Sequence, residues 1–258
     1  MTQPPSEINQ EPQATSQPQM VQVQLPGGVK TPSVTYVLLG LTILVYLLQM
    51  FSQSLFGATI DLPVIFGSKV NSLILQGEVW RLITPVLLHG SLLHIGFNMY
   101  ALFALGPSLE RAYGHWRYLT LYLLGAFAGN TLSFLFSPST SIGASTAIFA
   151  LVAAEVVFIY RNRKMFGARA KGMLVNLGVI IVVNLALGLN PGIDNWGHLG
   201  GLLGGAIFAW IAGPVYQLAV GAGGYELQDM HAGPRIKWGA LLTFGIFAAV
   251  VIGRMLAG

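Results

Sequence analysis

The chain of 258 residues contains no cysteine and very few charged residues. Without cysteine, disulfides, thiolate catalysis and cysteine metal sites are excluded, although the redox compartment stays open. Charged side chains make up 9% of the residues and hydrophobic ones 54%, whereas an ordinary soluble domain is roughly 25% charged. A normal solvated surface is therefore excluded, and we expect the lipid bilayer to be the main solvent of this protein.

A strong net charge is also missing, since the formal value is only +4. The basic residues are not gathered with aromatics into the kind of groove that nucleic acids need, so no nucleic-acid partner is expected. Residues 1–30 lack the apolar core of a signal peptide. Their many glutamine, proline and serine residues predict a disordered tail over residues 1–33.

Seven apolar runs predict an all-α, polytopic membrane helix bundle, because only helices or closed barrels satisfy their backbone in lipid. The expected helices cover about 34–51, 91–109, 116–136, 145–160, 173–189, 196–215 and 238–256. We divide the chain into the tail, a six-helix core over 34–215, a cytoplasmic linker over 216–236 and a seventh transmembrane helix over 237–258. The connection over 52–88 is too broken for a span and too apolar for a free linker, so it is expected in the membrane interface.

The segment from Arg161 to Lys171 carries five basic residues and no acidic residue. By the positive-inside rule it is expected in the cytoplasm. Counting spans from there places the N-terminus inside as well. The sequence thus predicts a multi-pass membrane protein. We interpret its location as the plasma membrane of a prokaryote.

Reactive residue types gather at one depth, in the outer half of this predicted bundle. They are His89, His94, Asn98, Ser145 and His198. Polar side chains in a span are costly and mark functional sites by default. His94 and Asn98 share a helix face because they are four residues apart.

Small residues surround two of these positions. Gly143 and Ala144 precede Ser145 at an expected helix start, where a backbone N–H is free to bind an oxyanion. Taken alone, a serine there is ordinarily an N-cap. Glycines recur beside His198, at 197, 200, 201, 204 and 205. They allow a neighbouring helix to approach closely. This is either a packing motif with an incidental histidine or an arrangement that brings His198 close enough to deprotonate Ser145.

Five motifs occur in order along the chain. They are Trp80-Arg81, His89-Gly-Ser-Leu-Leu-His94-Ile-Gly-Phe-Asn98, Gly106-Pro-Ser-Leu-Glu110-Arg-Ala-Tyr-Gly114, Gly143-Ala-Ser145 and Gly197-His198-Leu-Gly-Gly201. Together they resemble the rhomboid family of intramembrane serine proteases over nearly all of Trp80 to Trp210. The resemblance implies cleavage of a transmembrane protein substrate, with no metal and no cofactor; the oligomeric state is not specified.

The resemblance also assigns roles to single residues. Ser145 would be the nucleophile and His198 its base, in a dyad without an acid. The Ser145 amide, His94 and Asn98 would form the oxyanion hole. The supporting residues would be Phe149, which packs on the catalytic histidine, His89, which orders a loop or holds a water, and the glycines Gly143 and Gly201.

One position departs from the family, which usually has glycine where this chain has Thr146. A side chain there could crowd the substrate or rotate the serine. This motivates an alternative, an inactive rhomboid-like protein that binds membrane clients. A second alternative is a small transporter or channel, motivated by the intramembrane asparagines and by Glu155. Glu155 lies too far along its helix from Ser145 to complete a triad.

Overall fold

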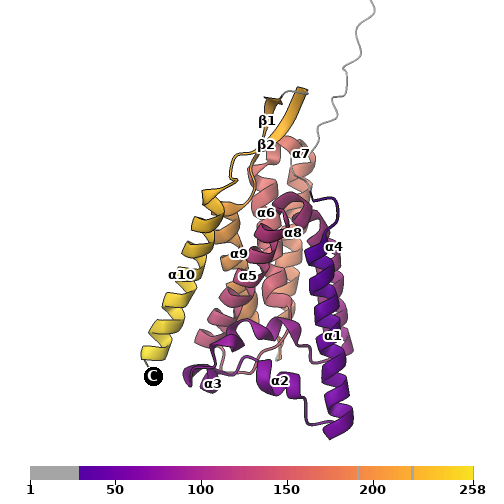
Figure 1. The fold of residues 1–258 in the computed structure, drawn as a ribbon, viewed down its shortest axis with the longest axis vertical. Helices are drawn as coiled ribbons and strands as arrows, with labels where there is room; N and C mark the ends of the chain where they lie inside the picture. Colours follow the sequence, from indigo (N-terminus) through magenta and orange to yellow (C-terminus); the bar gives the residue numbers. More distant parts are fainter. Residues whose placement is uncertain (1–28, 191, 222–223, 258) are drawn as a thin grey trace, which may run out of the picture.

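Long helices run through the length of the molecule, which is a computed structural model describing residues 29–190, 192–221 and 224–257 (Figure 1). Most of the predicted tail therefore lies outside the described residues. The long helices are α1 (Ser33–Phe56), α4 (Leu92–Tyr113), α5 (His115–Phe136), α6 (Ser145–Arg161), α8 (Arg169–Leu187), α9 (Asn195–Ala212) and α10 (Pro234–Leu256). Each corresponds to one of the predicted helices.

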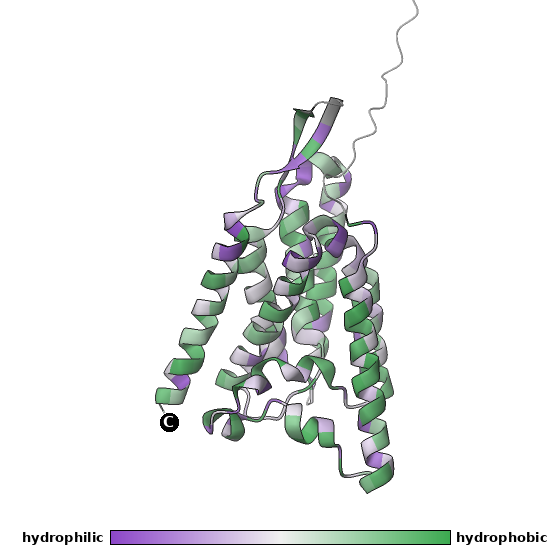
Figure 2. Ribbon diagram, in the orientation of Figure 1, coloured by the Kyte–Doolittle hydropathy of each residue, from purple (hydrophilic) through white to green (hydrophobic). Residues whose placement is uncertain are grey.

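The long helices are apolar along most of their length, and hydrophilic residues gather toward the ends of the bundle (Figure 2). Within the described residues, five of them are long and apolar enough to cross a membrane: α1, α4, α5, α8 and α10. The remaining two, α6 with 17 residues and α9 with 18, fall outside those limits and lie in the core of the bundle. The chain is an integral membrane protein with a polytopic helical fold, as the sequence predicts.

Helix α9 packs against both α6 and α5 through backbone rather than through large side chains. A Cβ atom at Gly201 on α9 would lie 2.1 Å from the Thr146 carbonyl oxygen on α6, and one at Gly205 would lie 2.4 Å from that of Ala150. On the other side of α9, a Cβ at Gly200 would lie 2.5 Å from the Ala128 carbonyl of α5. Only glycine permits this approach, so the glycines fix the distance between the helices that carry Ser145 and His198.

Glu110 joins α4 to the start of α1. Its fully buried carboxylate accepts hydrogen bonds from the Val34 and Thr35 amides at 2.9 and 2.7 Å. These are among the N–H groups that a helix leaves unpaired in its first turn. A Cβ at Gly106 would lie 2.6 Å from Thr35, which explains why a glycine precedes Glu110 by one turn.

The connection between α1 and α4 is folded, not extended. It contains the short helices α2 (Leu62–Gly67) and α3 (Asn71–Leu75) and the 3-10 turns η1 (Val79–Leu82) and η2 (Thr84–Leu87). The buried Arg81 guanidinium holds it together by donating to the Ser68 and Ile65 carbonyls at 2.8 and 2.9 Å. Both α2 and α3 lie against one end of the bundle (Figure 1).

The opposite end of the bundle differs in detail from the prediction. The sixth helix ends at Ala212, and residues expected in a linker form a β-hairpin of β1 (Tyr216–Gly221) and β2 (Gly224–Asp229). The fifth helix begins earlier, at Arg169, after a single turn α7 (Arg163–Phe166). The predicted boundaries followed the apolar runs. The fifth helix extends beyond its run because its backbone bonds can continue, whereas the sixth stops before the end of its run, where Gly213 and Pro214 follow Ala212.

Candidate active site

Ser145 is the first residue of α6 and is presented by a constrained loop. Gly143 has φ +130°, a conformation that other residues rarely adopt, and its amide donates to the Pro85 carbonyl at 2.9 Å. A Cβ at Gly143 would also lie 2.7 Å from Nε2 of His94. Glycine is therefore required here twice, for the turn and for the space that the imidazole fills.

His198 lies in the first turn of α9, whose start is fixed by Asp194. The Asp194 carboxylate caps the helix by accepting from the Gly197 amide at 3.0 Å, and the Ser133 hydroxyl of α5 donates to its other oxygen. Nε2 of His198 lies 3.0 Å from Oγ of Ser145. A neutral imidazole at that distance can accept the hydroxyl proton of a serine.

Phe149 holds the His198 ring in place. The two rings stack with centroids 4.3 Å apart and an interplanar angle of 21°. Nδ1 of His198 is buried and has no hydrogen-bond partner in the part of the chain that the structure describes. The arrangement is thus a pair of residues, and the nearby Asp194 serves the helix start.

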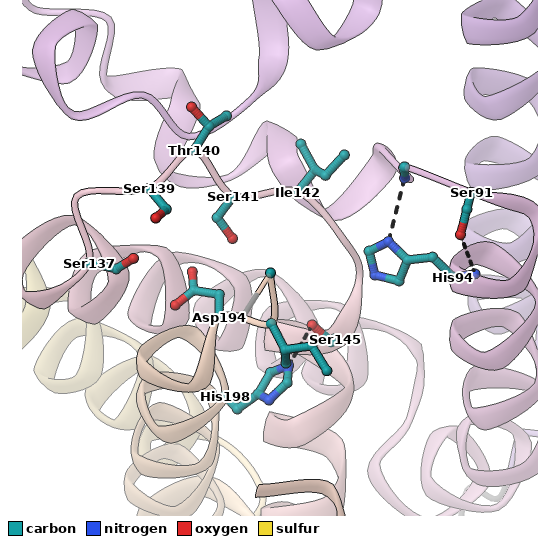
Figure 3. A pocket seen from close by; sticks show the side chains of 13 residues that line it. Ser91, His94, Ser137, Ser139, Thr140, Ser141, Ile142, Ser145, Asp194 and His198 are labelled. Carbon is teal, nitrogen blue, oxygen red and sulfur yellow. Dashed lines mark hydrogen bonds between the residues drawn. The ribbon is translucent and has the colours of Figure 1, made fainter. Parts of the chain in front are cut away.

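A cavity of about 540 Å³ opens above this pair (Figure 3). It brings together Ser145, His198 and His94, which Figure 3 shows projecting from α4 toward the pair. The other lining residues are mostly small or hydroxylated: Gly90, Ser91, Ser137, Ser139, Thr140, Ser141, Ile142, Gly192, Ile193 and Asp194. The cavity can admit an extended backbone and water while surrounding them with hydrogen-bonding groups.

Asn98 is not among the residues that line this cavity. It is buried one turn below His94, and its amide donates to the His94 carbonyl at 2.8 Å. The structure therefore brings together three of the four residues predicted for catalysis. An oxyanion role for Asn98 requires its side chain to leave that carbonyl.

His89 lies behind the serine loop and is almost completely buried, with 1% of its surface exposed. Its backbone exchanges two hydrogen bonds of 3.1 Å with the Gln49 side chain of α1, and its Nε2 lies 3.5 Å from the Ala144 amide. Burial, and then the neighbouring His94, lower the pKa of His89 to about 4. His89 is accordingly neutral near pH 7 and is placed to support the loop that leads to Ser145.

Thr146 points away from the cavity. Its methyl group lies against α5 and α9, where a Cβ at Gly129 would be 2.7 Å and one at Gly197 would be 3.1 Å from it. Only 3% of the residue is exposed. The side chain thus fills the helix interface beneath the serine, and it is not among the residues that line the cavity.

Lys69 was missed by the sequence analysis as a site residue. It is completely buried, and its ammonium donates to the carbonyls of Ser137 and Ser139 at 2.9 and 2.7 Å. Burial lowers the pKa of Lys69 to about 8, against the opposing charge of Asp194. Lys69 ties the connection after α1 to the serine-rich rim of the cavity. A single lysine whose partners are distant carbonyls leaves no pattern in the sequence.

The fold and the cavity define a class: a polytopic helical membrane protein with a half-buried serine–histidine pair at one end of its core helices. The rhomboid domain model matches residues 76–215, and the chain belongs to the rhomboid family. Over 175 residues, or 67% of the chain, it is 45% identical to a protein of Bacillus subtilis (strain 168) named rhomboid protease GluP.

Other relatives come from eukaryotes. RHOMBOID-like protein 9, chloroplastic, of Arabidopsis thaliana is 35% identical over 76% of the chain, and Rhomboid-like protease 1 of Toxoplasma gondii is 39% identical over 56%. The matched stretches cover 34%, 47% and 51% of the lengths of the Bacillus, Arabidopsis and Toxoplasma proteins. The chain thus spans a third to a half of these relatives.

Proposed function

We propose that this protein is an intramembrane serine protease that hydrolyses peptide bonds in or near transmembrane segments of membrane proteins. The observation that carries the proposal is the 3.0 Å contact between Nε2 of His198 and Oγ of Ser145 at the floor of a polar cavity. Two of the relatives are named as proteases, which supports the same reaction class.

In the proposed mechanism, His198 takes the hydroxyl proton as Oγ of Ser145 attacks the scissile carbonyl carbon. The imidazolium then gives this proton to the leaving amine, and an acyl-enzyme remains on Ser145. Water drawn from the cavity attacks the ester carbonyl, with His198 acting as base again. Water and substrate are the only reactants needed, and the acid product leaves with Ser145 regenerated.

The developing oxyanion would be bound by the Ser145 amide and by the imidazole of His94. The amide belongs to the first turn of α6, where helical N–H groups have no partner within the helix. His94 lies across Gly143 from the serine. Asn98 would join as a third donor after rotating away from the His94 carbonyl.

The two alternatives make different use of the same residues. A client-binding homologue without activity was motivated by Thr146, and the burial of that side chain between α5 and α9 removes the steric reason for it. A transporter was motivated by Glu155, which is not among the residues lining the large cavity. Transport that depends on Glu155 and not on Ser145 would favour that alternative.

The first test is labelling with a serine-directed fluorophosphonate. Ser145 in the native chain is expected to label, because the adjacent imidazole raises the nucleophilicity of its hydroxyl, and Ser145→Ala is expected to remain unlabelled. Ser141→Ala is a matched control, since it removes another hydroxyl from the same cavity. Absence of labelling in folded native protein, or equal labelling of both variants, would contradict an activated Ser145.

The proposed substrate is a membrane protein with a single span, and the proposed location is the plasma membrane of a prokaryote with the N-terminus in the cytoplasm. The division into a core over 34–215, a cytoplasmic segment over 216–236 and a seventh span over 237–258 is part of this proposal. It places the β-hairpin in the cytoplasm and the cavity toward the opposite face.

Reporter fusions test this topology. Fusions after Arg163, Asp194 and Gly258 are expected to report inside, outside and outside, because one span separates the first two positions and two spans separate the last two. The many basic residues near Arg163 hold that end in the cytoplasm. A cytoplasmic report after Gly258 would contradict the seven-span arrangement.

A further inference from the structure

Two arginines converge at the hairpin end of the bundle, far from the serine cavity. Arg161 is the last residue of α6 and Arg235 lies in the first turn of α10, and they are distant in sequence. Their guanidinium nitrogens lie 3.2 and 3.1 Å from the same atom, Nε2 of His231. Two positive groups are therefore held within a few ångströms of each other by one imidazole.

No carboxylate neutralises this pair within the described residues. Asp229 contacts the cluster through the His231 amide, but its carboxylate forms its ion pair with Arg117, at 2.9 Å, and also accepts from the Val215 amide. Burial, and then the charges of Arg161 and Arg235, lower the pKa of His231. This favours the neutral imidazole as the acceptor, and neither Arg161 nor Arg235 forms an ion pair with a carboxylate among the described residues.

The pair is built into the fold. The Arg161 guanidinium donates to the Trp210 carbonyl and lies over the Trp210 ring, 5.1 Å from its centroid. His231 is 5% exposed, and its position is fixed by the hydrogen bond from its own amide to Asp229. Arg235 is exposed and makes one described hydrogen bond, to His231, so most of its five N–H donors are available to a ligand.

Exposed aromatic residues mark the depth of this cluster. Tyr160, Trp210 and Trp238 are 49%, 53% and 67% exposed. Tyrosine and tryptophan collect at the level of lipid headgroups. Below them, exposed leucines continue on the same helix faces: Leu203 is seven residues before Trp210 and Leu241 three after Trp238, with 52% and 61% of their surfaces exposed.

We propose that Arg161 and Arg235 form a binding site for the phosphate group of an anionic phospholipid, whose acyl chains lie along the exposed faces of α9 and α10. Two adjacent guanidiniums match the oxygens of a phosphate. α10 begins at Pro234 with no acidic residue in its first turn, so its helix dipole favours an anion at the same place. A bound headgroup would join the end of α6 to the start of α10.

The test measures lipid binding to the full chain purified in neutral detergent, by native mass spectrometry and by thermal stability. Added phosphatidylglycerol is expected to remain bound and to raise the melting temperature, whereas phosphatidylcholine is not. Arg235→Gln is expected to weaken phosphatidylglycerol binding about fivefold, and Arg161→Gln/Arg235→Gln further, since one arginine near an anionic headgroup contributes about that factor.

Arg169→Gln is the matched control. It removes the same charge from an exposed position at the start of α8 and is expected to leave binding unchanged. Equal loss in Arg169→Gln and Arg235→Gln would show a diffuse surface attraction and overturn the site. Undiminished binding in folded Arg235→Gln, whose side chain is exposed, would overturn it as well.

Inorganic phosphate distinguishes a lipid from a free anion. Millimolar phosphate without lipid is expected to give no stabilisation, because the acyl chains supply part of the contact. If phosphate alone stabilises the native chain as well as phosphatidylglycerol does, and Arg235→Gln removes this effect, the ligand is a soluble phosphate and the lipid proposal is wrong.

Discussion

Ser145→Ala and His198→Ala are each expected to reduce cleavage of a transmembrane substrate to background, a loss of roughly ten-thousand-fold or more. The double variant is expected to be no worse than either single one. Oγ of Ser145 and Nε2 of His198 are 3.0 Å apart and act in one proton transfer, so removing either group removes the whole step. The measurement is the rate of product formation in detergent or liposomes.

Each variant must first melt near the native temperature, because His198 also packs on Phe149. Ser141→Ala, which changes the same cavity away from the pair, is expected to retain most of the activity. A folded His198→Ala protein that cleaves at close to the native rate would show that the proposed base is wrong.

Variants of the oxyanion donors are expected to lose cleavage only in part, in contrast to the dyad variants. His94→Ala removes one donor while the Ser145 amide stays, and such a donor is worth about 100- to 1,000-fold. A measurable remainder is therefore expected. Asn98 donates to the His94 carbonyl in this structure. Near-native activity of Asn98→Ala would contradict only the oxyanion role assigned to Asn98 and would not affect the dyad assignment.

Much of the fold was predictable because lipid imposes a simple rule on sequence. Each long apolar run has to be a helix, and all seven predicted runs correspond to helices such as α1 and α10. The sequence around His94 and Ser145 was equally informative. Helix geometry places His94 and Asn98, four residues apart, on one face, and the small residues before Ser145 predict that it stands at a helix start. These signals are local in sequence.

The features that were missed depend on contacts between distant segments. The β-hairpin is anchored by the Tyr216 amide donating to Asn162 and by the Asp229 ion pair with Arg117. Neither partner is near the hairpin in sequence. Lys69 holds carbonyls 68 and 70 residues away. Carbonyl groups exist at every residue, so no sequence pattern reveals which of them a buried lysine will meet.

The direction of the Thr146 side chain was also beyond the sequence. Its family position suggested crowding of the substrate, but the rotation of α6 turns it toward α5 and α9. The glycines at 129 and 197 leave the space that its methyl group fills. Thr146, where the family usually has glycine, is therefore accommodated by the small residues that surround it.

Gly201→Leu is expected to abolish cleavage, and Gly201→Ala is expected to be damaging as well. Even the alanine Cβ would lie 2.1 Å from the carbonyl oxygen of Thr146, the residue directly after the nucleophile. Backbone cannot rotate out of the way as a side chain can, so α9 has to move away from α6. Overpacking of this kind typically costs about 1–3 kcal/mol of folding free energy.

The movement also separates His198 on α9 from Ser145 on α6, and a displacement of about 1 Å costs roughly a hundredfold in rate. The measurements are the melting temperature and the cleavage rate of each variant. Gly245→Ala on α10 is the matched control, since its Cβ would meet no atom within 4 Å, and it should behave like the native protein. A Gly201→Ala protein with native stability and native rate would show that the spacing of α6 and α9 does not limit catalysis.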